Sequence, residues 1–293
     1  YCALTKPFLW KTCRVVSFHN MGYESYQANT LIRKLRKKLD ILLNKAMDGH
    51  TAVSRAVAVS YKYHLQLSSI EIINNIIPEK KILSLLPNAR PKSISKELDL
   101  EQHQIIMAGR LVPEKGAHLF VQSIKNIAPN NPDWNFKIIG TSKAGLTVLK
   151  TSYEKKVVEK FESLGVNTKY LGFINNNDVQ DILKSSSILV VPSLWDDPFP
   201  LTALEGLSNG LAIIASNRGG LTEMLQGKGI LLDNINEKNL ENSIINFISN
   251  DKLLLSYHNK AWNNYIYNQN SISKIQDDIR SKIYDNFYKN NIN

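Results

Sequence analysis

The sequence contains very little cysteine. Cys2 and Cys13 are the only two among its 293 residues, and both lie near the start. A disulfide framework needs more cysteines than this, and structural zinc needs a ligand set that these two residues do not provide. We therefore expect two free thiols and neither kind of site.

Long hydrophobic runs are also missing. No apolar stretch approaches the roughly 20 residues that a membrane-spanning helix requires. The start, YCALTKPFLWK, lacks the apolar core and the small-residue cleavage site of a signal peptide. These absences predict a soluble, cytoplasmic protein. Because the first residue is Tyr rather than Met, we expect the numbering to begin inside a longer product.

Acidic residues are outnumbered by basic ones. Lys and Arg total 36 against 26 Asp and Glu, which gives a net charge of +10. Such a charge suits nucleic acid, anionic lipid or a phosphate-rich substrate, and a compositional bias of the genome explains it equally well. No basic strand is interleaved with aromatic residues that would stack bases, so we expect no nucleic-acid partner.

Short β-branched runs alternate with segments of helical period, which predicts an α/β fold with a parallel sheet flanked by helices. The alternation is regular from residue 104 to about 250 and predicts a complete doubly wound domain of the Rossmann kind. Its expected strands are 105–108, 136–140, 168–171, 188–191, 212–215 and 229–232, and its expected helices are 116–128, 153–164, 178–184 and 201–208. The tail from residue 252 is predicted to be helical, with a break near 268–271.

The first part of the chain is less regular. We predict a buried strand at 13–19, a basic amphipathic helix at 28–47, strands near 56–59 and 82–86, and a linker at 89–104. A nucleotide-fold domain takes on the order of 150 residues, yet only about 90 precede this linker. We therefore expect an incomplete first domain at 1–94 and a second domain at 95–271, followed by a terminal helix at 272–293.

Ligands of open parallel sheets bind at the carboxyl ends of the strands, so the loops there carry the candidate chemistry. In MAGRLVPEKG, Gly109, Arg110 and Lys115 follow a strand and precede a helix. Arginine grips two phosphate oxygens and lysine supplies a point charge, so the loop is a candidate diphosphate cradle. The alternative is a solvated loop with a turn proline.

Two carboxylates bracket the turn in VVPSLWDDPFPLTALEGL. Asp197 lies before the expected helix and Glu205 about one turn inside it. Carboxylates accept hydrogen bonds from pairs of hydroxyls, which suits sugar and ribose; alternatively Asp197 only favours the helix N-terminus and Glu205 is a surface residue. Farther on, Gly219 and Gly220 let backbone approach a ligand or simply make a tight turn.

A histidine ends the first expected strand. His19 closes VVSFHN, at the mouth of the first-domain sheet. A lone histidine is more often structural than catalytic, although a strand-end position favours a functional role.

The ordered set G-R-L-x-x-E-K-G, L-G-F, P-S-x-x-x-D-P-F-x-L-T-A-L-E-G and A-S-N-R-G-G-L-T-E resembles the retaining glycosyltransferases of family 4, also called group 1. The resemblance covers most of residues 104–250. Looser matches are SFHN at 17–20, AVS at 58–60 and LPNA at 86–89. It implies the GT-B fold, with two Rossmann-like domains facing a cleft, of which 95–271 binds the nucleotide-sugar donor and 1–94 is an incomplete acceptor-side domain. It also implies that the terminal helix at 272–293 packs back on the first domain.

The resemblance also implies roles for individual residues. Gly109, Arg110 and Lys115 would bind the donor diphosphate and stabilise it as the leaving group. Glu205 would bind the ribose, Asp197 would hold hydroxyls of the transferred sugar, and His19 would reach that sugar. The remaining implied donor-binding residues are Phe199 and Leu201 through backbone amides, Thr202, and Phe173 in the segment 171–174 beside the nucleobase.

Two positions depart from the family pattern. Asp197 replaces the usual Glu, and Pro200 replaces the usual Gly and removes an amide donor. Both departures leave the donor preference open.

The implied reaction is transfer of a sugar with retention and without a covalent intermediate, so the protein must supply positioning and charge stabilisation. No Asp-x-Asp pair lies in a strand-end loop, so we expect neither a metal nor another cofactor. The implied acceptor is a glycan or lipid-linked glycan of bacterial surface polysaccharide or lipopolysaccharide. The alternative is an inactive, truncated remnant that still binds nucleotide.

The helix at 31–47 has a second possible partner. Leucines at 31, 35, 39 and 42 form one stripe with Ala46, beside the basic run 33–38. Such a helix suits peripheral contact with anionic lipid on the inner face of the cytoplasmic membrane. The alternative is a domain helix with a solvated basic face.

Overall fold

The computed structural model describes residues 12–22, 31–77, 103–143, 145 and 148–291. These residues form two compact units. Unit 1 takes its residues from Tyr1–Ile76, Asp196–Phe199 and Ile266–Asn293, and unit 2 from Ile77–Trp195 and Pro200–Tyr265. The short loop Asp196–Phe199 therefore groups with unit 1, whereas the sequence places it inside the second domain.

Unit 2 is built on a six-stranded parallel sheet in the order β6-β5-β4-β7-β8-β9. The strands are β4 (Gln104–Ala108), β5 (Asn135–Ile139), β6 (Thr168–Tyr170), β7 (Ile188–Val191), β8 (Ala212–Ser216) and β9 (Ile230–Leu232). From β4 the chain adds strands on one side and then returns to add β7 on the other, which is the Rossmann arrangement. The expected α/β class is confirmed, and these strands begin and end within one or two residues of their predicted positions.

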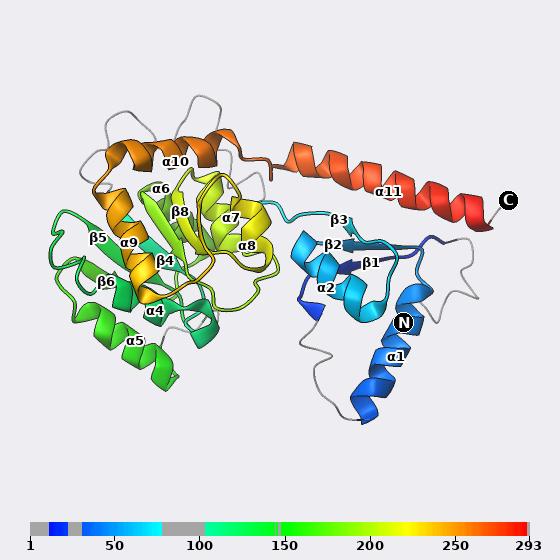
Figure 1. Cartoon of the computed structure of the whole chain (residues 1–293), viewed down its shortest axis with the longest axis horizontal. Helices are drawn as coiled ribbons and strands as arrows, with labels where there is room; N and C mark the ends of the chain where they lie inside the picture. Colours follow the sequence, from blue (N-terminus) through cyan, green and yellow to red (C-terminus); the bar gives the residue numbers. More distant parts are fainter. Residues whose placement is uncertain (1–11, 23–30, 78–102, 144, 146–147, 292–293) are drawn as a thin grey trace. The chain divides into compact units, whose positions relative to one another are not determined.

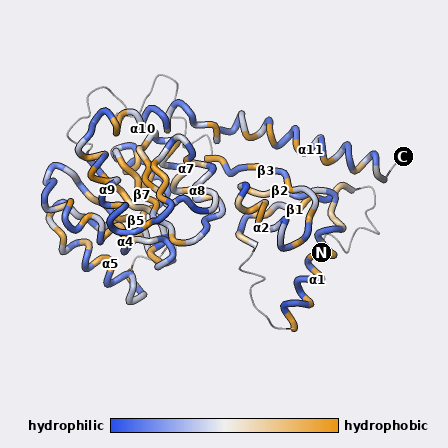
Figure 2. The backbone as a smooth tube through the Cα atoms, in the orientation of Figure 1, coloured by the Kyte–Doolittle hydropathy of each residue, from blue (hydrophilic) through white to orange (hydrophobic). Residues whose placement is uncertain are grey.

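Helices cover both faces of this sheet (Figure 1). On one face lie α4 (Ala117–Ser123), α5 (Ser152–Glu162) and α9 (Glu237–Ile248), whose buried Phe120, Phe161 and Phe247 share a core with the strands. On the other, α7 (Leu201–Ser208) presses Gly206 against Leu189 and Ile213. The other helices of unit 2 are the 3-10 turn η4 (Pro113–Lys115), α6 (Asn176–Lys184), α8 (Gly219–Leu225) and α10 (Asp251–Asn263). Figure 2 shows the hydrophobic residues concentrated on the strands between these layers.

Unit 1 contains a smaller parallel sheet in the order β1-β2-β3. Its elements are β1 (Val15–Phe18), α1 (Leu31–Lys45), β2 (Gly49–Ala52), α2 (Arg55–Leu65), β3 (Glu71–Ile72) and α11 (Gln269–Asn291). The last helix contacts this sheet, because Ile283 lies against Gly49 and the Lys282 ammonium is 2.6 Å from the carboxylate of Glu71.

One prediction for unit 1 is wrong, and another is correct only in part. Residues 56–59 belong to α2, because the Ser54 side chain accepts a hydrogen bond from the Val57 amide and so caps a helix there. The segment 13–19 contains the predicted strand, as β1, but this strand is only partly buried: Phe18 is buried and Val15 is 47% exposed. The predicted strand at 82–86, the linker up to residue 102 and Cys2 lie outside the described residues, while Cys13 has a free thiol.

Candidate active site

A pocket opens at the carboxyl ends of the central strands of unit 2. Strands β4 and β7 are neighbours whose following segments lead to opposite sides of the sheet, and ligands of such sheets bind at this point. The pocket has a volume of about 180 Å³, below the 300–1,000 Å³ typical of sites for whole drug-sized ligands, so it fits one part of a larger ligand. It is lined by Ala108, Gly109, Arg110, Ile139, Gly140, Thr141, Phe173, Ile174, Asn176, Val179, Thr202 and Glu205.

Two glycines form the floor between β4 and β5. A Cβ atom on Gly140, whose φ is 123°, would stand 1.9 Å from the carbonyl oxygen of Gly109. Two backbone hydrogen bonds hold the ends of β4 and β5 at this separation. The Gly109 amide donates to the carbonyl of Ile139 (3.0 Å), and the Leu111 amide donates to the carbonyl of Thr141 (3.1 Å). No atom of the residues that the structure describes would come within 4 Å of a Cβ on Gly109. The backbone at Gly109 thus faces open space into which a ligand can approach closely.

A third glycine fixes the loop after β4 against the end of β7. Gly116 has a φ of 72°, and a Cβ there would lie 2.0 Å from the carbonyl oxygen of Pro192. The Leu194 amide also donates to the carbonyl of Glu114 at 2.8 Å. The turn that carries Lys115 is therefore held by backbone contacts on both sides.

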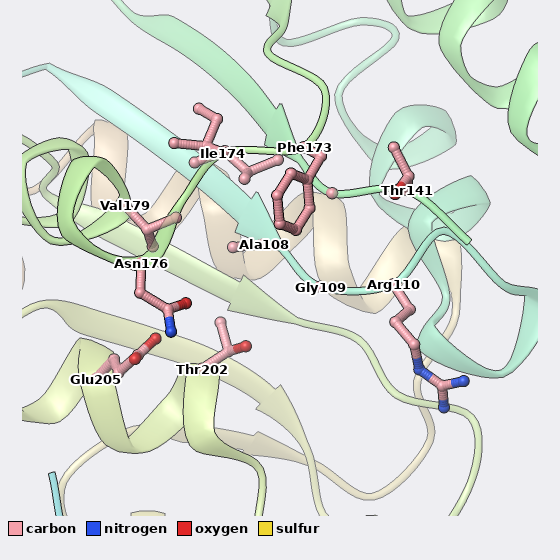
Figure 3. Close-up of a pocket in the computed structure, with 12 residues that line it drawn as sticks. Ala108, Gly109, Arg110, Thr141, Phe173, Ile174, Asn176, Val179, Thr202 and Glu205 are labelled. Atoms are coloured by element: carbon pink, nitrogen blue, oxygen red, sulfur yellow. The ribbon is translucent and has the colours of Figure 1, made fainter. Parts of the chain in front are cut away.

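The two candidate cations occupy different places. Arg110 is exposed and lines the pocket, with its guanidinium directed away from the Phe173 ring (Figure 3). Lys115 is not one of the lining residues, and its ammonium lies 5.4 Å from the centre of the Trp195 ring, in cation–π range. Arg110 is thus the cation that the structure brings to the pocket.

A carboxylate and an amide lie on the side of the pocket formed by α6 and α7. Glu205 and Thr202 project from α7, and Asn176 from the start of α6, toward the same space (Figure 3). A carboxylate accepts hydrogen bonds from two neighbouring hydroxyls, and an amide both donates and accepts. This wall is therefore suited to a diol such as that of a ribose. Leu201, also on α7 and 55% exposed, is not among the lining residues.

The rest of the pocket is apolar. Phe173 is 42% exposed and lines the same pocket as Ala108 and Gly109 (Figure 3). Ile174 and Val179 line the pocket next to it. An exposed aromatic face in such a place offers a stacking surface for a planar ring.

Three predicted site residues belong to unit 1. His19 follows β1, is exposed, and has its Nε2 3.1 Å from the Ser17 hydroxyl oxygen. Asp197 and Phe199 are buried in the loop Asp196–Phe199, where the Phe199 ring meets the edge of Tyr267 at 5.5 Å between centroids. The pocket in unit 2 therefore brings together five of the predicted residues, namely Gly109, Arg110, Phe173, Thr202 and Glu205.

Sequence reasoning missed several residues that form or support the pocket. Asn176 and Thr141 line the pocket but belong to no recognisable sequence motif. Gly140 could have been found, because a glycine at the end of a predicted strand often marks a place where another part of the backbone approaches closely. Glu154 supports the loop after β5: its buried carboxylate accepts hydrogen bonds from the amides of Ser142 (2.5 Å) and Thr151 (2.8 Å). Its signal is the capping box that it makes with Thr151 at the start of α5.

The environment of Glu154 shifts its ionisation. Burial raises the pKa of this carboxyl, but the hydrogen bonds from Thr151 and Ser142 outweigh burial and lower the pKa from 4.5 to about 2. The carboxylate is thus ionised at neutral pH and ties the β5 loop, which carries Thr141, to α5.

The described part of the chain contains neither a membrane-spanning helix nor a cluster of metal ligands. None of the helices there is long and apolar enough to cross a membrane. Within the same residues, no three His, Cys, Asp or Glu side chains gather where they would hold a metal ion.

Known proteins share this sequence pattern. A UDP-Gal:α-D-GlcNAc-diphosphoundecaprenol α-1,3-galactosyltransferase of Escherichia coli is 28% identical over 282 residues, which are 93% of this chain and 69% of the relative. A lipopolysaccharide 1,2-N-acetylglucosaminetransferase of Salmonella typhimurium is 27% identical over 145 residues, 50% of this chain and 38% of the relative. The chain thus spans about two thirds of the first relative and well under half of the second.

Solved structures share the fold. The Anabaena protein HepE, in a crystal structure with UDP, superposes with a TM-score of 0.75 at 18% identity, over 96% of this chain and 74% of that chain. A sucrose-phosphate synthase from Thermosynechococcus elongatus gives 0.69 at 17% identity, over 96% and 71%. The expected GT-B fold is confirmed. The family described as glycosyl transferases group 1 matches residues 90–269, more than half of the sequence, and the chain therefore belongs to that family.

Proposed function

We propose that the protein transfers a sugar from a uridine-diphosphate sugar to a glycan or lipid-linked glycan acceptor. The observation that carries the proposal is the pocket of unit 2, where an aromatic face, a carboxylate and an arginine line one cavity at the switch point of the sheet. These groups match the base, the ribose and the diphosphate of a nucleotide. UDP as the nucleotide is supported by the names of the E. coli relative and of the HepE complex.

Each residue then has a distinct task. Phe173 stacks on the base, Glu205 accepts hydrogen bonds from the ribose hydroxyls, and Arg110 neutralises the diphosphate. Lys115 adds a second positive charge once it leaves Trp195. Negative charge develops on the departing diphosphate in the transition state, and these two cations are positioned to stabilise it.

The finer features of the reaction rest on the motif resemblance. They are retention of anomeric configuration as in family 4, contact of His19 and Asp197 with the transferred sugar, and activity without a metal. The nucleotide sugar is a substrate rather than a cofactor. A lipid-linked acceptor places the protein at the inner face of the cytoplasmic membrane.

The test is UDP binding by calorimetry, followed by transfer assays over a panel of UDP-, GDP- and ADP-sugars with EDTA present. Glu205→Ala and Arg110→Ala are each expected to weaken UDP binding at least tenfold, since each removes a charge-assisted contact worth about 1.5–3 kcal/mol. Matched controls are the exposed Glu162→Ala and Lys155→Ala on α5, which should leave binding unchanged.

Three outcomes would count against the proposal. Full activity in Glu205→Ala or Arg110→Ala would refute the site assignment. Tighter binding of GDP or ADP than of UDP would refute the choice of nucleotide. UDP binding without transfer from any donor would favour the alternative of a protein that only binds nucleotide.

A further inference from the structure

Helix α1 in unit 1 exposes its hydrophobic residues. None of its residues is buried, and five large apolar side chains are more than half exposed: Leu31 74%, Ile32 79%, Leu35 58%, Leu39 54% and Leu42 67%. Their spacing places them along one side of the helix, which we call the leucine face. A helix of a globular domain normally turns such a face toward the core. In α1 the leucine face is turned away from it.

The opposite side of α1 is polar and packs on the unit. Five positions of the same turns are partly buried: Lys37, Asp40, Ile41 and Asn44 lie on this side, and Leu43 lies at its border with the leucine face. The carbonyl oxygen of Asn44 lies 3.0 Å from Nε2 of His50 on β2. Three of these five partly buried residues are polar, whereas all five residues of the leucine face are more than half exposed, which is the reverse of an ordinary amphipathic helix.

Electrostatic effects place the same polar side against α2. Burial raises the pKa of Tyr61, and the charge of Asp40 raises it further. Burial lowers the pKa of His64, and the charge of Lys37 lowers it further. Tyr61 and His64 both belong to α2, so the polar side of α1 faces that helix and the leucine face does not.

Basic residues border the leucine face. Lys34, Lys38 and Lys45 follow one edge at helical spacing, and Arg36 lies at the other, where its guanidinium is 75% exposed and 4.0 Å from Asp40. The helix carries six Lys or Arg and one Asp, a net charge of +5. A second copy of α1 would bring the same charge to the contact and be repelled. A bilayer with anionic headgroups offers both an apolar interior and the opposite charge.

We propose that α1 lies in the surface of an anionic lipid bilayer, with its leucine face inserted among the acyl chains and its bordering lysines among the headgroups. The inference deepens the proposed function and rests on it in one respect: a lipid-linked acceptor is presented at such a surface. Insertion of the leucine face distinguishes this mode of binding from that of a solvated basic helix, which would bind the same membrane by charge alone.

The experiment is co-sedimentation of the whole chain with vesicles of phosphatidylcholine and of a 70:30 mixture of phosphatidylcholine and phosphatidylglycerol. The insertion variant is Leu35→Gln/Leu39→Gln/Leu42→Gln. Its matched control, Val148→Gln/Val166→Gln/Ile245→Gln, removes three exposed apolar side chains of unit 2. The charge variant is Lys34→Gln/Lys38→Gln.

We expect the wild type and the control to bind the mixed vesicles alike and the insertion variant to bind at least tenfold more weakly. The charge variant should lose about 25-fold on the mixed vesicles, roughly fivefold per neutralised lysine, and little on pure phosphatidylcholine. In 0.5 M NaCl the wild type should keep a residual binding that the insertion variant lacks, because salt screens charge but not apolar contact.

Three results would overturn the inference: no binding of the wild type to mixed vesicles, equal binding by the insertion variant, or a wild-type dimer that the insertion variant converts to monomer in sedimentation velocity. The last would assign the leucine face to a second copy. UDP affinity is measured in parallel on every variant. If the insertion variant loses vesicle binding but keeps its UDP affinity, α1 binds the membrane independently of the nucleotide site. If the wild type binds vesicles but not UDP, only the proposed function is rejected.

Discussion

At the scale of single residues, the pocket depends on a glycine that the motifs do not include. Replacing Gly140 by Ala puts a Cβ 1.9 Å from the Gly109 carbonyl oxygen, a backbone atom that moves only with its strand. We expect Gly140→Ala to lower the free energy of unfolding by about 2 kcal/mol or more and to weaken UDP binding. The checks are urea unfolding and calorimetry.

Gly145 provides the control for this prediction. It also has a positive φ, 80°, but among the described residues no atom would come within 4 Å of a Cβ there. Gly145→Ala should therefore cost only the backbone strain of about 1–2 kcal/mol and leave UDP affinity unchanged. Equal losses in the two variants would mean that close packing against Gly109 contributes nothing.

Glu154 makes the stability of the folded protein depend on pH. Its pKa is about 2 in the folded protein against 4.5 for an ordinary glutamate, so its contribution is complete above pH 4.5 and is lost as the pH falls from 4.5 toward 2. A shift of this size corresponds to about 3 kcal/mol. In Glu154→Gln, stability should be lower at pH 7 and should fall less steeply between pH 5 and 3, as followed by circular dichroism in urea. Asp181→Asn, an exposed carboxylate on α6, should retain the wild-type slope.

At the scale of elements, the helix caps decide how the pocket walls are held. The Asn175 side chain accepts hydrogen bonds from the amides of Asn177 and Asp178 and so starts α6, the helix that brings Asn176 and Val179 to the pocket. Asn175→Ala should cost about 1 kcal/mol of stability and also reduce UDP affinity several-fold. Asn236 caps α9 in the same way, because its side chain accepts a hydrogen bond from the Asn239 amide. None of the residues that line the pocket comes from α9. Asn236→Ala should thus lose the same stability with no change in affinity.

The elements of unit 2 could be predicted because their signals are local. Ile188–Val191 is apolar throughout, as expected of a central parallel strand buried on both faces, and the helix Leu201–Ser208 begins directly after Pro200. In unit 1 the local signals compete. The β-branched residues of 56–59 favour a strand, but the Ser54 cap and the packing of Val57 and Leu65 produce a helix.

The site was predictable to the extent that motifs mark it. Arg110 and Glu205 stand in ordered motifs, and both line the pocket. Asn176 joins them only because the chain turns after β6, and the cation–π contact of Lys115 requires Trp195 from the loop after β7. Such contacts between distant segments leave no periodic trace in the sequence.

At the scale of the whole molecule, the C-terminal helix contributes to the stability of unit 1. Ile283 of α11 is 7% exposed and fills the space beside Gly49. Ile283→Ala should lower the free energy of unfolding by about 2–4 kcal/mol. Ile275→Ala on the same helix, where the side chain is 42% exposed, should cost less than 1 kcal/mol. Loss of UDP binding in Ile283→Ala under conditions where it remains folded would contradict a purely structural role.

The contact between Gly49 and Ile283 also limits how such proteins can recombine. A Cβ on residue 49 would come within 2.6 Å of the Ile283 side chain, so glycine on β2 and isoleucine on α11 have to be inherited together although 234 positions separate them. A chimera that takes residues 12–76 from one parent and 269–291 from another would mismatch this pair whenever the first parent carries a larger residue at 49. Crossovers that move both segments as one module should yield folded hybrids more often.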